Sequence, residues 1–209
     1  MLLSLLTIAI IGFLLLRLLI VELQIFGYIN NVFPKCAQLR TMIVAGSGGH
    51  TTEILRLVNS LSQYYSPRLY VIASSDAMSP EKIKISELNS NDFSIYSIPR
   101  SREVLQSYLT SVLTTVRSAA YCFPLVAWQK PDLVLCNGPG TCIPVCFAAF
   151  LYRLLLLKDC RIVFVESICR VNSLSLSGRI LYYLADHVIV QWPELLDQFP
   201  RARYLGRIV

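Results

Sequence analysis

Hydrophobic and polar positions divide the chain into one long apolar segment and a series of shorter apolar runs. Residues 1–29 contain only two charged side chains, Arg17 and Glu22, and the segment exceeds the about 20 residues needed to cross a bilayer. The pattern predicts a transmembrane anchor over 1–29, a linker over 30–40 and one domain over 41–209. A cleaved signal peptide is the competing interpretation, but its basic start, shorter apolar segment and small-residue cleavage site are not evident.

Charged residues around this segment predict its orientation. No Lys or Arg precedes it, whereas Arg17, Lys35 and Arg40 lie at or beyond its far end. The positive-inside rule then places everything after the anchor in the cytosol. Arg17 can extend to the headgroups from that end of the span.

Behind the anchor, short apolar runs alternate with stretches of helical periodicity. Strands are expected at 42–45, 68–73, 93–98, 132–136, 161–165, 187–190 and 202–205. Helices are expected from His50, within 74–91, over 100–128 with Pro124 ending or kinking it, over 142–157 and over 176–184. The alternation predicts α/β architecture, a Rossmann-like parallel sheet covered on both faces.

The apolar helix over 142–157 is open to a second interpretation as another membrane span. It is shorter than a span requires, contains Pro144 and Arg153, and lies between two strands. A helix that is buried or faces the membrane is therefore preferred.

Two glycine-rich loops follow strands of the predicted sheet. They are Gly46-Ser47-Gly48-Gly49-His50 after the first strand and Asn137-Gly138-Pro139-Gly140-Thr141 after the fourth. Ligands gather at the carboxyl ends of parallel strands, and helix N-termini favour phosphate. The pair is a candidate diphosphate site, although either loop alone is also explained by a tight strand-to-helix turn. Thr51 replaces the third glycine of the dinucleotide fingerprint, so no nicotinamide cofactor is expected.

Net charge and composition limit the classes of partner that the chain is expected to bind. Hydrophobic residues make up 55% of the 209 residues, the net charge is +6 and the pI is about 9.0, which suits a lipid diphosphate or the cytosolic membrane face. No lysine-rich run or RNA-binding motif points to nucleic acid. The seven cysteines lack a CxxC pair and mostly fall in apolar segments, which indicates reduced core residues.

Several segments match the motifs of one known family. They are AGSGGHTTEILRL, IPRSREVLQSY, LVLCNGPGTCIP, VFVESICRVNSLSLSGRILY, the pair Ala185-Asp186, VQWPEL and the terminal YLGRIV. From about Thr41 to Val209 the chain resembles the asparagine-linked glycosylation 14 proteins, the membrane-anchor subunits of the two-component UDP-N-acetylglucosamine transferase of the dolichol pathway. More distantly, the glycine loops are similar to the acceptor half of the bacterial enzyme that makes lipid II.

The resemblance implies a GT-B glycosyltransferase divided between two chains. This chain would be the acceptor half, inactive alone, with its N-terminus in the lumen of the endoplasmic reticulum. It would recruit a soluble UDP-N-acetylglucosamine-binding subunit of the asparagine-linked glycosylation 13 family into a heterodimer or larger assembly. Together they would add the second N-acetylglucosamine, through a β1,4 bond, to N-acetylglucosaminyl-diphosphodolichol without a cofactor. The end at Val209, which leaves no room for a second half, agrees with this expectation.

Two other functions remain open from the sequence. One is a purely structural anchor that holds the partner at the membrane by an inert Rossmann-like fold. The other is an independent membrane-bound nucleotide-dependent enzyme, which the broken dinucleotide fingerprint and the missing second half disfavour.

Inverting transfer to a hydroxyl needs a base, and two residues are candidates. His50 either serves as the base, caps its helix or contacts the diphosphate. Glu166, just past the fifth strand, either serves as the base or forms a loop-bridging ion pair with Arg170. No Asp-x-Asp triplet occurs, so no metal is expected in this chain.

The remaining site residues follow from the loops and the family. Acceptor-binding candidates are Gly46, Ser47, Gly48, Gly49, Arg100, Arg102, Asn137, Gly138, Gly140 and Thr141. The two arginines are suited to phosphate by charge-assisted hydrogen bonds, unless they only form a solvated basic loop. The resemblance makes Arg207, Ile208 and Val209 partner-binding residues, and a frayed tail is the alternative.

Overall fold

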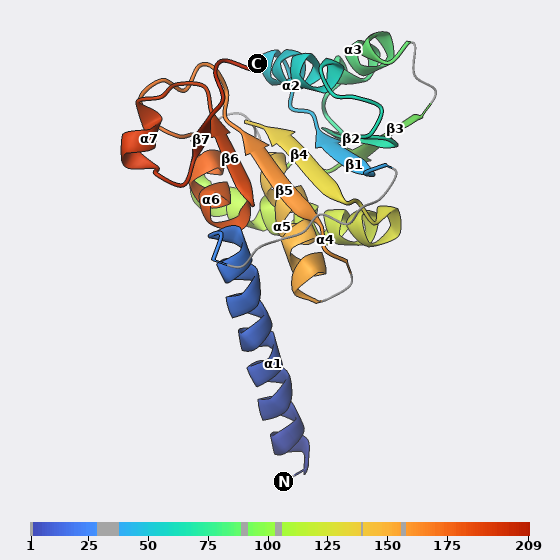
Figure 1. The fold of residues 1–209 in the computed structure, drawn as a ribbon. Helices are drawn as coiled ribbons and strands as arrows, with labels where there is room; N and C mark the ends of the chain where they lie inside the picture. Colours follow the sequence, from blue (N-terminus) through green and yellow to red (C-terminus); the bar gives the residue numbers. More distant parts are fainter. Residues whose placement is uncertain (1, 29–37, 89–91, 103–105, 139, 156–157) are drawn as a thin grey trace.

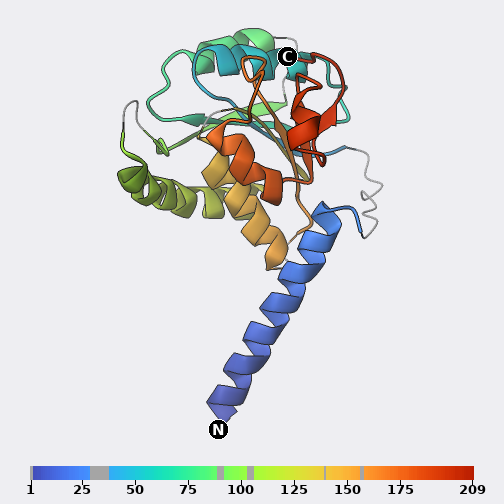
Figure 2. The same cartoon turned by 90° about the vertical axis from the view of Figure 1, so that its left-hand side faces the viewer.

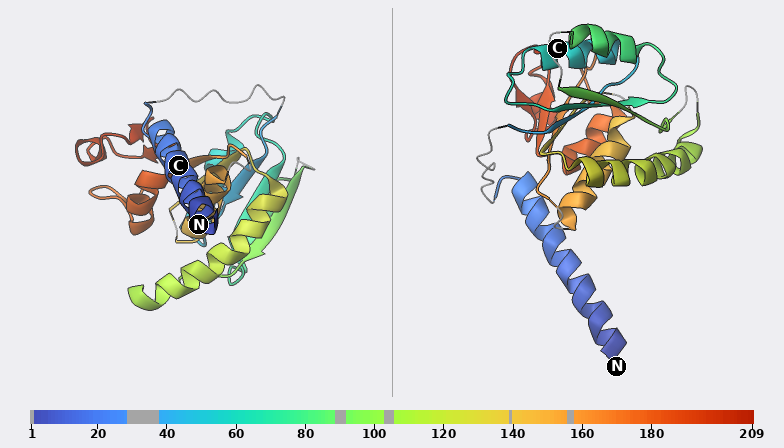
Figure 3. Two further views of the ribbon diagram at one scale, coloured as in Figure 1. Left: turned by 90° about the horizontal axis from the view of Figure 1, so that it is seen from below. Right: turned by 90° about the vertical axis from the view of Figure 1, so that its right-hand side faces the viewer.

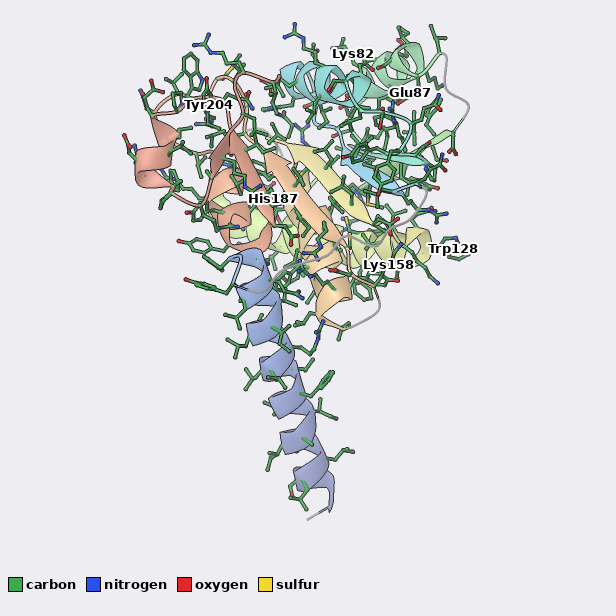
Figure 4. All side chains as sticks on the ribbon, in the orientation of Figure 1. Lys82, Glu87, Trp128, Lys158, His187 and Tyr204 are labelled. Carbon is green, nitrogen blue, oxygen red and sulfur yellow. The ribbon has the colours of Figure 1, made fainter. Side chains whose placement is uncertain are left out.

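One long helix projects from an α/β domain in the computed structural model of the chain (Figure 1). The structure describes residues 2–28, 38–88, 92–102, 106–138, 140–155 and 158–209. Helix α1 (Leu2–Ile25) carries a candidate membrane span over Ser4–Ile25, the one such helix in the described ranges. Its apolar side chains project into open space along most of its length (Figure 4). The helix is compatible with a single-pass anchor.

Seven parallel strands form one sheet in the order β3-β2-β1-β4-β5-β6-β7. Their bounds are β1 (Thr41–Val44), β2 (Arg68–Ala73), β3 (Phe93–Ile98), β4 (Leu133–Asn137), β5 (Arg161–Val165), β6 (His187–Val190) and β7 (Arg203–Tyr204). Strands β1 and β4 are buried along their whole length, as expected of central strands that helices cover on both faces. The strand order reverses between β1 and β4. The predicted parallel α/β fold is confirmed.

Helices cover both faces of the sheet. On one face lie α2 (Gly49–Asn59) and α3 (Ser79–Ser86); on the other lie α4 (Tyr108–Gln129), α5 (Cys142–Leu154) and α6 (Leu176–Leu184). Figures 1 and 2 show that α1 extends from the side of α4, α5 and α6, away from α2 and α3. The short α7 (Leu195–Gln198) lies beside the β7 edge. The domain is therefore layered, and the anchor belongs to one of its two faces.

The inner end of α1 is packed against the domain. Val21 and Ile25 are 0% and 4% exposed. Arg17 Nη2 donates to the Arg153 carbonyl at 3.2 Å, and Arg153 Nη2 donates to Gln24 Oε1 at 2.7 Å. Arg153 also pairs with Asp186 at 2.9 Å. Because apolar and polar contacts both join α1 to α5, the inner end of α1 is held in one position relative to the domain.

Helix α4 differs from its prediction. It begins at Tyr108 rather than near Arg100, and Pro124 lies inside it without ending it. Residues 103–105 of the predicted helix lie outside the described residues, as do 156–157 at the end of the predicted 142–157 helix. The apolar positions Val112 and Val116 of α4 are 59% and 62% exposed, because the helix directs Cys122 and Val126 into the core instead.

Candidate functional site

A pocket of about 680 Å³ lies where both glycine loops leave the sheet. This is the carboxyl edge, at the reversal of strand order, where ligands of open parallel sheets bind. The predicted site residues that line it are Ser47, His50, Arg100, Arg102, Gly138, Gly140 and Thr141. The structure thus brings together residues about 90 positions apart in the sequence.

The first loop is fixed by its own backbone geometry and by Thr51. Gly48 has φ 68, a left-handed conformation that glycine adopts without strain. The hydroxyl of the buried Thr51 donates to the Gly46 carbonyl and lies 2.6 Å from the Ser79 hydroxyl. The Gly46 carbonyl is therefore a hydrogen-bond acceptor that holds the loop in place. The residue that breaks the dinucleotide fingerprint is the one that ties the loop down.

His50 is held in one orientation at the start of α2. Its Nδ1 lies 3.1 Å from Asn137 Oδ1 and 3.3 Å from Glu53 Oε2. The Asn137 amide is oriented in turn, because its Nδ2 donates to the Val165 carbonyl at 3.3 Å. Both partners of Nδ1 are acceptors, so the proton belongs on Nδ1 and the Nε2 lone pair is left to accept a proton. The side chain is 35% exposed, so a ligand can reach it.

Glu53 joins His50 to the loop after β5. Its Oε1 accepts from the Ser167 hydroxyl at 2.8 Å and from the Ile168 N–H at 3.3 Å, while Oε2 faces His50. The sequence patterns alone did not single out Glu53. Its spacing of i, i+3 from His50 on a predicted helix was the available signal.

The second loop needs glycine at position 138. Gly138 has φ 69, and a Cβ built there would collide with the His50 ring. The close approach of backbone and imidazole thus depends on a residue without a side chain. Gly49 and Asn137 lie beside this contact, Gly49 on a smaller adjoining pocket that also touches His50 and Glu166.

Glu166 is fully buried and fully engaged. Its Oε1 accepts from the Ser167 N–H at 3.1 Å, and its Oε2 accepts from the Ser175 N–H and hydroxyl at 2.8 and 2.9 Å. Burial raises the pKa of this carboxyl, and the hydrogen bonds and the charge of Arg170 offset part of the rise. The carboxylate holds the first turn of α6, whose N-cap is Ser175.

Arginines surround the polar end of the pocket. Arg100 donates to the Ser75 hydroxyl at 3.4 Å, and Arg102 donates twice to the Gln106 carbonyl, at 3.0 and 3.3 Å. Arg170, which the sequence suggested only as a partner of Glu166, lines both the main pocket and the smaller one. Three guanidinium groups give this end of the pocket a positive charge suited to phosphate.

The predicted partner-binding tail lies elsewhere on the molecule. The Arg207 guanidinium stacks 4.0 Å from the centre of the Trp192 ring, and the Ile208 N–H donates to Gln191 Oε1 at 2.9 Å. Val209 is 7% exposed and packs in the hydrophobic cluster under α2. The tail is therefore an ordered part of the domain.

Cysteine and acidic side chains form no metal centre in the described part of the chain, where no group of three or more His, Cys, Asp or Glu is placed to hold an ion. Cys136 and Cys146 are buried 3.4 Å apart. Burial raises the pKa of the Cys136 thiol, and the hydrogen bond with Cys136 together with burial raises that of Cys146. They pack as apolar residues.

Comparison with known proteins gives one consistent family. The family model described as "Oligosaccharide biosynthesis protein Alg14 like" matches residues 41–208. Proteins named UDP-N-acetylglucosamine transferase subunit ALG14 are 58% identical in Mus musculus and 54% in Homo sapiens, each over 86% of this chain and 87% of the relative. The Schizosaccharomyces pombe protein of that name is 42% identical over 85% of this chain and 87% of its own length.

Solved structures share the fold at low identity. Acinetobacter baumannii MurG superposes with a TM-score of 0.55 at 19% identity over 75% of this chain, and a UDP-N-acetylglucosamine 2-epimerase with 0.58 at 18% over 78%. This chain spans only 42% of the length of either structure. The likeness shows one Rossmann-like unit of the kind found in these larger proteins.

Proposed function

This chain belongs to the Alg14-like family of oligosaccharide biosynthesis proteins, and we propose on that premise that it is the membrane-anchored, acceptor-binding subunit of a split UDP-N-acetylglucosamine transferase. Its acceptor is N-acetylglucosaminyl-diphosphodolichol, which receives a second sugar through a β1,4 bond. A soluble subunit of the asparagine-linked glycosylation 13 family binds the nucleotide sugar and joins this chain in a heterodimer or larger assembly. The relatives' name, which calls each a transferase subunit, supports the need for a second chain.

One observation carries the proposal: both glycine loops, His50 and three arginines meet in a single pocket. The N-terminus of α2 begins at the first loop and that of α5 follows the second, so two helix starts with their partial positive charge face the pocket. Arg100, Arg102 and Arg170 add full charges. The acceptor diphosphate binds at this end, with its sugar toward His50.

His50 is the base of the proposed transfer. Its Nε2 takes the proton from the 4-hydroxyl of the acceptor sugar as that oxygen attacks C1 of the donor sugar. The C1–O bond to UDP breaks with inversion, and UDP leaves with the bonding electron pair. Glu53, beside Nδ1, stabilises the imidazolium that forms. Glu166 supports the site by holding α6, since its carboxylate is fully buried and accepts three hydrogen bonds.

The domain sits on the cytosolic face of the endoplasmic reticulum membrane, with residues 1–29 as anchor, 30–40 as linker and the N-terminus in the lumen. The excess of basic residues after the span supports this orientation. A tag on the N-terminus is expected to resist protease added to sealed microsomes while the domain is digested. Digestion of the tag alone would reverse the orientation.

The test measures transfer from labelled UDP-N-acetylglucosamine to a lipid diphosphate N-acetylglucosamine. It uses this chain alone, the soluble partner alone, and both together. Activity is expected in the mixture only, whereas activity of the partner alone would reduce this chain to a structural anchor.

The variant His50→Ala further separates a catalytic role of this chain from a purely structural anchoring role. It is expected to lower turnover by about 10²- to 10⁴-fold, the usual contribution of a general base, while the partner still co-purifies. His187→Gln is the matched control, because the other histidine begins β6 at the opposite edge of the sheet (Figure 4). Full turnover by His50→Ala would remove the base from the proposal.

A further inference from the structure

The pocket that holds the glycine loops is also lined by aliphatic side chains of α4, α5 and α6. On one side, Val112 and Val116 of α4 line it at i, i+4 spacing; on the other, Leu176 and Ile180 of α6 do the same. Ile143 near the start of α5 forms the floor between them. We call these five residues the α4–α6 groove.

Its walls are unusually exposed for branched aliphatic side chains. Val112 and Val116 are 59% and 62% exposed, and Leu176 and Ile180 are 51% and 39% exposed. Each helix buries its other face against the domain, α4 through residues such as Cys122 and α6 through Leu181. The exposed stripes therefore contribute nothing to the core, and covering them from water would be favourable.

The groove belongs to the face of the domain that carries the anchor. Helices α4, α5 and α6 all lie on the side of the sheet from which α1 projects, as the view from below shows (Figure 3). Since the inner end of α1 is packed on α5, the bilayer surface lies close to these helices. A hydrocarbon chain can pass from the membrane into the groove without crossing the domain.

We propose that the α4–α6 groove receives the part of the acceptor's hydrocarbon chain next to its diphosphate. The inference rests on the proposed function, which places the diphosphate and sugar at the polar end of the same pocket. One cavity is lined both by arginines and glycine loops and by aliphatic side chains of α4 and α6, and this combination fits one amphiphilic ligand. A segment of a partner protein seated here would occupy the cavity that holds His50, so the lipid is the better occupant.

The experiment compares two acceptors in the full complex of this chain and its soluble partner. One acceptor is N-acetylglucosaminyl diphosphate on a long polyisoprenoid, and the other carries a short, water-soluble alkyl chain. The double variant Val116→Asn/Ile180→Asn is expected to lower kcat/KM for the long-chain acceptor about tenfold, through lost apolar contact. With the short-chain acceptor, kcat/KM is expected to remain within about twofold, because that chain gains little from the groove.

Two matched control variants test whether the loss of kcat/KM is specific to the groove. Leu113→Asn changes a residue of α4 that is 74% exposed but does not line the pocket, and Ile85→Asn changes a 68% exposed residue of α3 on the far face. Neither is expected to alter the ratio between the acceptors. An equal loss in Leu113→Asn, equal losses on both acceptors, or loss of the co-purified partner from the double variant would each overturn the groove as the lipid site.

A measurement without turnover separates this inference from the proposed function. A polyisoprenyl diphosphate with a diazirine on its first isoprene units is photolysed with the full-length chain in detergent. Cross-links are expected on peptides of α4 and α6 and are expected to fall several-fold in the double variant. Labelling elsewhere would overturn the groove even if the complex is active, whereas an inactive wild-type complex with labelled α4 and α6 would overturn only the proposed reaction.

Discussion

His50 is positioned by residues of three separate elements, and this arrangement determines what the imidazole can do. Asn137 from the end of β4 and Glu53 from α2 both accept at Nδ1. The loop after β5 fixes Glu53 through Ser167. An imidazole held this way presents Nε2 to the pocket and has a carboxylate in place for the positive charge that develops.

Glu53→Gln is expected to lower kcat by about 10- to 100-fold with little change in KM, because the amide cannot stabilise an imidazolium as a carboxylate does. Combined with His50→Ala it is expected to add almost nothing, since the two residues act as a unit. Steady-state kinetics of the complex across a pH series measures both effects.

Ser167→Ala is the control for a merely structural role of Glu53. It removes the other main contact of the carboxylate but leaves His50 untouched. If Ser167→Ala and Glu53→Gln lower kcat equally and both losses persist in the His50→Ala background, Glu53 only anchors the loop and the positioning role is wrong.

Gly138→Ala is expected to lower turnover about a hundredfold, because the new Cβ would displace the His50 ring from its position. Gly206→Ala is the matched control: Gly206 also has positive φ, 87, but a Cβ there meets nothing within 4 Å. Both variants are expected to lose about 1–2 kcal/mol of stability from the left-handed backbone. Thermal unfolding and transfer assays of both variants measure the losses of stability and of turnover. Equal turnover in the two variants would contradict the contact between position 138 and His50.

The sequence singled out the glycines and His50 that meet at the pocket, but it did not single out Glu53, and it suggested Arg170 only as a partner of Glu166 and not as a lining residue of the pocket. The glycine loops have a local pattern that a strand and a helix make recognisable. Glu53 and Arg170 depend on which loops the fold brings together, and that information is not local. Glu166 illustrates the same limit: its place after a strand suggested a base, and only the structure shows that the carboxylate is buried and accepts three hydrogen bonds.

The start of α6 is important for the site, because this helix forms one side of the α4–α6 groove. Ser175 caps it by accepting from the Gly178 N–H at 2.9 Å while donating its hydroxyl to Glu166. Gly178 itself has no room for a Cβ, which would collide with Glu166 Oε2. The carboxylate, the cap and the glycine are therefore one interlocked unit.

Ser175→Ala is expected to destabilise the chain by about 1–2 kcal/mol, because it removes the cap and one donor to a buried carboxylate. Ser107→Ala, at the exposed N-cap of α4, is expected to cost about half as much or less. Thermal unfolding in detergent compares the two. A larger loss of stability in Ser107→Ala than in Ser175→Ala would show that the Ser175 cap, with its contact to Glu166, is not the stronger of the two.

The sequence predicted most strands within a residue because buried parallel strands form continuous apolar runs. Strands β2, β3, β5 and β6 have the expected bounds. The start of α4 could not be predicted in this way. Thr114 donates to the Ser101 carbonyl at 2.6 Å, and Ser101 is buried, so a tertiary contact with α4 holds Ser101 outside the helix.

For the whole molecule, the two faces of the sheet have different tasks. The face with α4, α5 and α6 is joined to α1 and bears the exposed aliphatic residues of the α4–α6 groove, and Trp128 at the end of α4 is 84% exposed (Figure 4). The C-terminus lies on the opposite face, beside α2 (Figure 1). A membrane contact and a protein contact can therefore coexist without competing for surface.

The residues of the C-terminal tail are expected to have two different roles. Val209 is buried under α2, whereas Arg207 is exposed over Trp192. We propose that Arg207 contacts the soluble partner and that Val209 anchors the tail. Removing residues 207–209 would then lower both the stability of the domain and the recovery of the partner, so truncation alone does not separate the roles.

Two single variants separate them. Val209→Ala is expected to cost about 1–2 kcal/mol in thermal unfolding while partner recovery at low temperature stays close to wild type. Arg207→Ala loses only an exposed cation–π contact of about 0.5–1 kcal/mol, yet it is expected to reduce the co-purified partner several-fold. Because the truncation lacks both residues, unchanged recovery of the partner after it would remove the tail from the interface, whatever its effect on unfolding.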